Sequence, residues 1–418
     1  MRDRLPPVLG LCNLPFGLYG GVMLTTIPQL LAARGVPQPY IASITAIGLS
    51  PGFFFFLASP MLDVRFSRKT YAYFFGSITP LLLALALTST ANLTLVSILL
   101  FGGQFAAALY SSALGGWLGS LVSPADEARL GTWFAIGNFG GYGLTSMVGI
   151  TLLRELPFAA GVGLLCLMTL LPMLLFSFLP ALEPDRRLAS ESFSRFFADV
   201  LELLRKPVVL RALPFFLTPC ASFALVNTLG ALGRDFSTPE ATAARIVGVG
   251  ASMAAIGSLL VPALARRIAL RSLYLLVGSV GAFFTLTLIV LPHTPVSFAL
   301  AVVGENLFGT AATAVATAII FDTIGKNNPL AATQFAVLNA AILLPPTYMQ
   351  EIDGLGYGWN GLLGTFLTDA SLSLIACGIL AFAMSLPRWR ALLATPSLLA
   401  EVPVNLARPI ESDGERPY

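Results

Sequence analysis

Two acidic residues stand inside long apolar stretches of this chain. Glu305 lies in the stretch 296–321, about ten residues in, which is near mid-depth of a membrane helix at about 1.5 Å of rise per residue. Asp369 lies at a similar depth in 361–386. A carboxyl group inside a bilayer indicates a proton site or a ligand for a cationic group. Both residues are therefore candidates for proton coupling, and a permanently protonated acid hydrogen-bonded to a neighbouring helix is the alternative.

Other charged side chains lie closer to the ends of apolar stretches. We expect them to be solvated at the membrane interfaces. They are Arg154, Glu155, Arg234, Glu351 and Asp353.

Amide side chains are the second polar group within the apolar stretches. An unpaired amide in hydrocarbon costs several kcal/mol, to an order of magnitude. Each amide must therefore bond another helix, backbone, water or a bound solute, and hydrogen bonding between helices is the more common case. The residues are Asn13, Gln104, Asn138, Asn227, Asn306 and Asn339.

A short polar segment between the second and third apolar stretches combines one acid with three bases: Asp63, Arg65, Arg68 and Lys69. The carboxylate can cap a helix or pair with a base, and the bases can bind carbonyl groups at helix C-termini. Such contacts are suited to gating. For Arg68 and Lys69 the alternative is the general excess of basic residues in cytoplasmic loops, whereas an acid contributes little to topology.

The composition excludes most other classes of protein. Apolar residues make up 56% and charged residues 11% of the 418 residues, against about 45–50% and about 25% in soluble domains. The four cysteines lie within apolar stretches and form no metal motif or disulfide framework, and the single histidine, His293, lies in a short turn. No H-E-x-x-H or nucleotide-binding P-loop motif occurs. We therefore expect no enzyme activity, no metal and no cofactor.

Twelve apolar stretches are each about long enough to cross a bilayer, which needs about twenty residues. Because the first is followed by many others, we expect no cleaved signal peptide. Arg34, Arg154, Arg234 and Arg245 lie on one side of the predicted membrane, and the rest of the 24 Lys and Arg residues lie on the other. Both termini and the central loop are therefore predicted to be cytoplasmic. The stretches are 8–31, 41–62, 70–90, 95–120, 131–153, 157–180, 211–233, 244–264, 271–292, 296–321, 330–351 and 361–386.

The second six stretches repeat the first six. Residues 59–77 align without a gap with 261–279, an offset of 202 (261 minus 59). The pattern T-x-F-A-x-x-N occurs at 132–138 and again at 333–339. Six stretches per half give both halves the same orientation, as in parallel-repeat transporters. The runs of small residues 111–119 and 309–318 are explained by close helix packing, with room for a bulky solute as the alternative.

The repeat divides the chain into two helical bundles, 1–180 and 211–390. The polar segment 181–210 joins them, and its apolar residues follow a helical period, which predicts an amphipathic helix on the cytoplasmic membrane surface. The tail 391–418 is polar and contains prolines, so we expect it to be disordered. The predicted fold is an all-α membrane protein with twelve transmembrane helices in two pseudo-symmetric six-helix bundles.

The segment 63–69 resembles the acidic-then-basic gating motif of the major facilitator superfamily. It departs from that motif at Ser59 and Phe66, where the family has glycine. In that fold the first and fourth spans of each half line the central cavity. The resemblance therefore implies solute contacts for Asn13, Gln104, Asn227 and Asn306 and inter-bundle packing for Asn138 and Asn339. It also places Glu305 on a cavity-lining span and Asp369 on a peripheral one.

Within the superfamily, residues 11–63 and 331–345 are similar to the AmpG-like branch, which includes muropeptide permeases and acetyl-CoA transporters and is close to some siderophore importers. The expected function is proton-coupled uptake of a small solute, such as a muropeptide or siderophore, across the inner membrane. The expected partners are the solute, protons and the lipid bilayer, with no nucleic acid, and the expected state is a monomer. Export of drugs or metabolites and a non-transporting receptor are the alternatives.

Overall fold

The computed structural model describes residues 5–180, 205, 207–325 and 328–386. All regular elements of this part are helices, and it contains no strand. Eight helices are long and apolar enough to cross a membrane, which confirms an all-helical membrane protein. The described residues up to Ala381 form one compact unit.

The first half begins with four short helical segments in succession, because prolines interrupt the first apolar stretch. Two longer helices then start at side-chain caps, where Ser67 accepts a hydrogen bond from the backbone of Thr70 and Asn92 from that of Leu95. The elements are α1 (Leu5–Leu11), α2 (Leu14–Gly21), the π-helix Val22–Thr26, α3 (Ile27–Ala33), α4 (Gln38–Leu49), 3₁₀ turns at Ser50–Phe53, Phe55–Leu57 and Ser59–Asp63, α5 (Arg68–Thr88), α6 (Leu93–Gly119), a 3₁₀ turn at Pro124–Asp126, α7 (Glu127–Glu155), α8 (Phe158–Leu170) and the 3₁₀ segment Leu171–Phe178.

The second half also begins with short helical segments and continues with longer helices. Its last element, labelled α16, changes direction in the middle. Asn360 and Gly361 have non-helical backbone angles, with φ of +55° at Gly361, so α16 consists of two helices joined by a sharp turn. The elements are α10 (Pro207–Leu217), a 3₁₀ turn at Pro219–Ala221, α11 (Leu225–Thr228), the 3₁₀ segment Leu229–Phe236, α12 (Glu240–Gly257), a 3₁₀ turn at Ser258–Leu260, α13 (Val261–Ala265), α14 (Leu270–Leu288), α15 (Pro295–Ile324) and α16 (Ala331–Ser385).

Helical segments cover all twelve predicted stretches. Only eight helices of the described residues, however, are long and apolar enough to cross a membrane as a single helix. The stretches 41–62 and 211–233 are broken into short helices and 3₁₀ turns, in which prolines recur. The helix over 131–153 is rich in glycine and polar residues, which lowers its hydropathy. The last two stretches carry the single label α16 and are therefore counted once. The central segment 181–210, apart from Arg205 and the first residues of α10, and the tail 391–418 lie outside the described residues.

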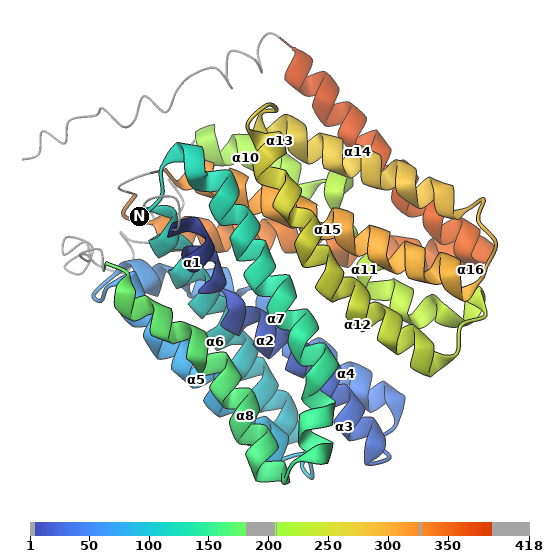
Figure 1. The fold of residues 1–418 in the computed structure, drawn as a ribbon. Helices are drawn as coiled ribbons and strands as arrows, with labels where there is room; N and C mark the ends of the chain where they lie inside the picture. Colours follow the sequence, from blue (N-terminus) through green and yellow to red (C-terminus); the bar gives the residue numbers. More distant parts are fainter. Residues whose placement is uncertain (1–4, 181–204, 206, 326–327, 387–418) are drawn as a thin grey trace, which may run out of the picture. The chain divides into compact units, whose positions relative to one another are not determined.

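The two halves meet along glycine-lined helix contacts. Figure 1 shows α7 running alongside α2 of its own half and α12 of the other, and α7 also packs against α15. A Cβ atom on Gly131 of α7 would lie 2.6 Å from the carbonyl oxygen of Ala314, and one on Gly116 of α6 would lie 2.5 Å from the backbone nitrogen of Ala332. The small residues of these helices therefore contribute to close packing between the halves, as the sequence predicts.

We predict that Gly131→Ala destabilises the protein, because a methyl group at this position overlaps the α15 backbone, which cannot move as a side chain can. Overpacking of this kind costs about 1–3 kcal/mol. Gly140→Ala on the same helix is the matched control, because a Cβ atom at Gly140 would have nothing within 4 Å. Alanine is the better helix former, so this control should keep or raise stability. Thermal unfolding in detergent measures both, and equal midpoints would contradict the packing argument.

Candidate functional site

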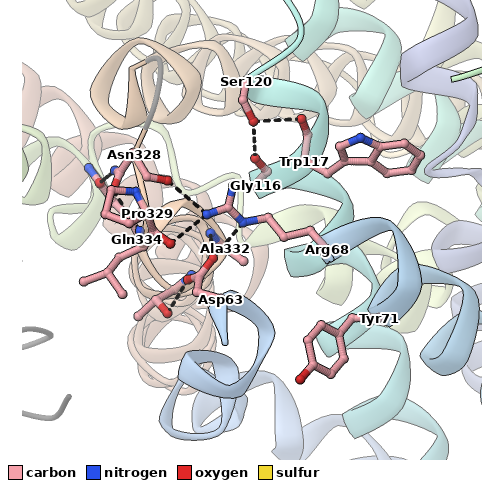
Figure 2. A network of polar contacts seen from close by, with 12 residues as sticks. Asp63, Arg68, Tyr71, Gly116, Trp117, Ser120, Asn328, Pro329, Ala332 and Gln334 are labelled. Carbon is pink, nitrogen blue, oxygen red and sulfur yellow. Dashed lines mark hydrogen bonds and ion pairs between the residues drawn. The ribbon is translucent and has the colours of Figure 1, made fainter. Parts of the chain in front are cut away.

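Asp63 forms the most extensive polar contact between the halves. Its Oδ1 accepts hydrogen bonds from Arg68 Nε (2.7 Å) and from the backbone N–H of Ala332 (3.1 Å). Its Oδ2 accepts from the backbone N–H of Thr333 (2.8 Å) and from the Thr333 hydroxyl (2.7 Å). Figure 2 shows the carboxylate facing the first turn of α16, and the residue is 4% exposed. The first N–H groups of a helix lack intrahelical partners and carry partial positive charge. A carboxylate at this position accepts their hydrogen bonds and offsets their charge.

Arg68 provides the second contact between the halves. Besides its ion pair with Asp63, its Nη2 donates to the carbonyl oxygens of Asn328 (2.9 Å) and Pro329 (2.8 Å), as Figure 2 shows. The Asn328 amide is itself held by Gln334, whose Oε1 accepts from Nδ2 at 2.6 Å. Asp63 and Arg68 together therefore bind both the first turn of α16 and the backbone that leads into it.

The other two predicted gating residues lie elsewhere. Lys69 donates to the carbonyl oxygen of Leu179 (2.6 Å), and its Nζ lies 5.6 Å from the centre of the Trp117 ring, so it bonds within the first half. Arg65 is exposed, and its guanidinium lies 5.8 Å from the centre of the Phe66 ring. The φ of Arg65 is +70°, which places it in the left-handed region at the turn after Asp63.

Glu305 is fully buried in the second half. It is 0% exposed, and its Oε1 accepts a hydrogen bond from the Thr285 hydroxyl of α14 at 2.5 Å. Its Oε2 is buried without a partner. No basic side chain among the described residues forms an ion pair with it. Since a buried unpaired charge is very costly, this environment suits a neutral carboxyl group.

Two further carboxyl groups lie within electrostatic range of Glu305. Asp369 is 4% exposed and Asp353 is 1% exposed, and each has one buried oxygen without a partner. The Thr368 hydroxyl donates to Asp353 Oδ1 at 3.4 Å. Glu305, Asp353 and Asp369 are called the carboxyl cluster below. Within the described part of the chain, no three such side chains are grouped closely enough to hold a metal ion.

The burial of Asp353 corrects the expectation that it is solvated at an interface. The first helix of α16 continues past the predicted end at residue 351, and the turn at Asn360 and Gly361 folds the second helix back onto it. The Thr365 hydroxyl consequently donates to the Asp353 carbonyl at 3.3 Å. Glu351, two residues earlier, is exposed as expected.

Three of the four amides predicted to contact a solute, Asn13, Gln104 and Asn306, are buried. Asn13 is 1% exposed; its Nδ2 donates to the carbonyl of Phe134 and its Oδ1 accepts from the Ser111 hydroxyl, both at 3.3 Å. Asn306 donates to the carbonyl of Val302 in its own helix at 2.8 Å. Gln104 is 9% exposed. The side chain of Asn227 is not among those described, and Asn138 and Asn339 are half-buried.

The sequence analysis did not predict which residues donate hydrogen bonds to Asp63. Thr333 belongs to the repeated pattern T-x-F-A-x-x-N, and its counterpart Thr132 has a buried hydroxyl without a partner. At the repeat offset of 202, the counterpart of Asp63 is residue 265 (63 plus 202), which is Ala265. The paired signal of an acid in one half and a threonine in the other could have indicated this contact before the structure.

Comparison with known proteins identifies the family. The family model described as Major Facilitator Superfamily matches residues 9–346. A sequence search among curated proteins finds no match. Among solved structures, the human organic anion transporter MFSD10 (TETRAN) is similar over 91% of this chain and 99% of its own, with a TM-score of 0.69 and 18% identity.

Two other solved structures share the fold at low sequence identity. The proton:xylose symporter XylE has a TM-score of 0.68 and 12% identity, with 90% of this chain and 94% of its own covered. A bacterial homologue of the iron transporter ferroportin, in the outward-facing state, has a TM-score of 0.66 and 13% identity, with 94% and 100% covered. Since the family model spans most of both halves, this chain belongs to the major facilitator superfamily and is a membrane transporter, not an enzyme.

Proposed function

We propose that this protein is a proton-coupled secondary carrier that takes up a small solute across the inner membrane by alternating access. The observation that carries the proposal is the contact of Asp63 and Arg68 with the start of α16, which joins the two halves at one end. Alternating access by rocking of two halves needs contacts that form in one state and break in another. The twelve-span arrangement, with cytoplasmic termini and halves at 1–180 and 211–390, is part of this proposal.

The position of the Asp63 contact supports a role as an inner gate. Under the predicted topology, the end of the 3₁₀ turn Ser59–Asp63, the start of α5 and the start of α16 all lie on the cytoplasmic side. The glycine contact of Gly116 with α16 lies beside them. A state with these contacts is closed on the inside, and breaking them exposes the N-terminal amides of α16 and a buried carboxylate.

The carboxyl cluster supports proton coupling. Three buried carboxyl groups that form no ion pair with any described basic residue cannot all be charged. A proton that is bound in one state and released in another therefore changes the stability of that state. Glu305 is the central proton-coupling residue of this proposal because it contacts α14 through Thr285 and interacts with both acids of α16. Asp369 and Asp353 are its partners.

The solute is proposed from the resemblance to the AmpG-like branch, which favours a muropeptide, a siderophore or a similar molecule. Export of drugs or metabolites is the alternative direction of transport. Uptake assays in proteoliposomes with an imposed pH gradient, over a panel of muropeptides, siderophores and acyl-CoA precursors, test the proposal. Accumulation of one solute that requires the gradient supports it. A complete lack of flux for the whole panel, in both directions, favours a receptor.

The first prediction of the proposal concerns the gate. Asp63→Asn leaves a single acceptor oxygen facing donors from Arg68, Ala332 and Thr333. Hydrogen bonds to a charged group are worth about 1.5–3 kcal/mol, and a loss of about 2 kcal/mol shifts the population of the closed state by about 30-fold. We expect a slower transport cycle and faster alkylation of a cysteine reporter at Ser112, which is 0% exposed and one turn before Gly116.

The control for the gate is Asp126→Asn. Asp126 forms a partly exposed ion pair with Arg129 at 3.4 Å and accepts a hydrogen bond from the Ser123 hydroxyl at 2.8 Å, both within the first half. This variant should label at the parent rate. If Asp63→Asn and Asp126→Asn label and transport like the parent, Asp63 is not part of the gate.

The second prediction concerns coupling. Glu305→Gln keeps a donor and an acceptor next to Thr285 but cannot exchange a proton. We expect solute accumulation driven by a pH gradient to fall by at least about 10-fold, while downhill exchange of the solute remains within about two-fold of the parent. Glu351→Gln, at an exposed position on α16, is the matched control and should keep both activities. Undiminished accumulation by Glu305→Gln would exclude Glu305 from coupling and leave Asp369 or the solute itself as the proton carrier.

A further inference from the structure

Two arginine side chains of the second half each have a buried N–H group that no acceptor satisfies. Arg211 lies on α10 and Arg271 on α14, both are partly buried, and their positive charges lie within electrostatic range of each other. The Nε atom of each is buried and has no hydrogen-bond partner. The positive charge of this pair therefore needs an anion.

Among the described residues, Asp322 of α15 is the one acid that forms an ion pair with either arginine, and its partner is Arg271. Its Oδ2 lies 3.7 Å from Arg271 Nη2, which is too long for a hydrogen bond, and its side chain is 48% exposed. Arg211 forms no ion pair and no hydrogen bond within the described part of the chain. Each guanidinium carries five N–H donors, and this half-exposed carboxylate satisfies neither of the two buried Nε–H groups.

Two basic residues of the first half have a structural role, because protein acceptors satisfy their donors. Arg68 makes three hydrogen bonds, and Lys69, which is the repeat counterpart of Arg271, binds a carbonyl oxygen. In the second half the counterpart position has no such acceptor. Unmet buried donors cost about 1–3 kcal/mol each, so packing alone does not explain why two guanidinium groups are held within electrostatic range of each other.

We propose that Arg211 and Arg271 form a binding site for a phosphate-type anion, presented by the headgroup of an acidic membrane lipid. A guanidinium fork binds two phosphate oxygens at once, and two adjacent guanidinium groups offset a full negative charge and more. The starts of α10 and α14 and the end of α15 lie at the same end of their bundle, which is the cytoplasmic side under the predicted topology. Basic pockets between helices on that side suit anionic headgroups. Free phosphate offers the same oxygens.

The test measures the stabilisation of the full-length protein in an uncharged detergent during titration with phosphatidylglycerol, phosphatidylcholine or inorganic phosphate. The apparent Kd comes from the shift in thermal unfolding. We expect phosphatidylglycerol to stabilise the parent, and Arg211→Gln to weaken its apparent Kd by about 10-fold. Arg267→Gln, at an exposed position near the same end, is the matched control and should change it by less than about two-fold.

The outcomes separate the sources of the anion. If phosphatidylglycerol stabilises the protein, phosphate does not, and the effect requires Arg211, the site binds a lipid headgroup. If inorganic phosphate also stabilises the protein and this effect requires Arg211 to the same degree, the same site binds a free anion. Should Arg211→Gln not fold, Arg211→Lys keeps the charge but loses the fork, and a weakened Kd in that variant supports the site. Equal losses in the Arg211 and Arg267 variants, or no stabilisation by either anion, would overturn the proposal.

Discussion

The charged cap that Asp63 places on α16 is the interaction on which the arrangement of the two halves depends. A carboxylate that is 4% exposed is stable only because Arg68 offsets its charge and the first turn of α16 supplies the remaining donors. Neither half can satisfy this carboxylate alone. Its partners in the second half, Ala332 and Thr333, are 269 and 270 residues away in sequence, so separation of the halves breaks these contacts and leaves Asp63 only its ion pair with Arg68. A set of contacts that is present only when the halves are together is what a gate requires.

Close packing makes this cap possible. Gly116 and Gly131 let the helices of one half approach the backbone of the other, and side chains at these two positions would hold the halves apart. Aromatic residues fill the space between these contacts: the centre of the Phe134 ring lies 5.9 Å from that of Phe321 and 5.7 Å from that of Phe335. The polar and apolar contacts therefore reinforce the same closed end.

The repeat is symmetric in fold but not in chemistry. Asp63 has Ala265 as its counterpart, and the hydroxyl of Thr132 is left unpartnered where Thr333 bonds the carboxylate. The second half instead holds the carboxyl cluster. One half thus supplies the acid of the proposed gate, and the other supplies the groups proposed to carry the proton, so a cycle that couples the two needs contact between the halves.

The amino-acid sequence alone determined the helical membrane class, the repeat and the candidates Asp63 and Glu305, because hydropathy and charge act over about twenty neighbouring residues. Burial of Asp353 and the acceptors of Arg68 were decided only by the tertiary structure. Each depends on which helix lies opposite, and a carboxyl group near the end of an apolar stretch has the same local sequence whether it meets water or a returning helix. Partners more than two hundred residues apart leave no local pattern, so the cap of α16 could be traced only through a comparison of the two repeats or in the tertiary structure itself.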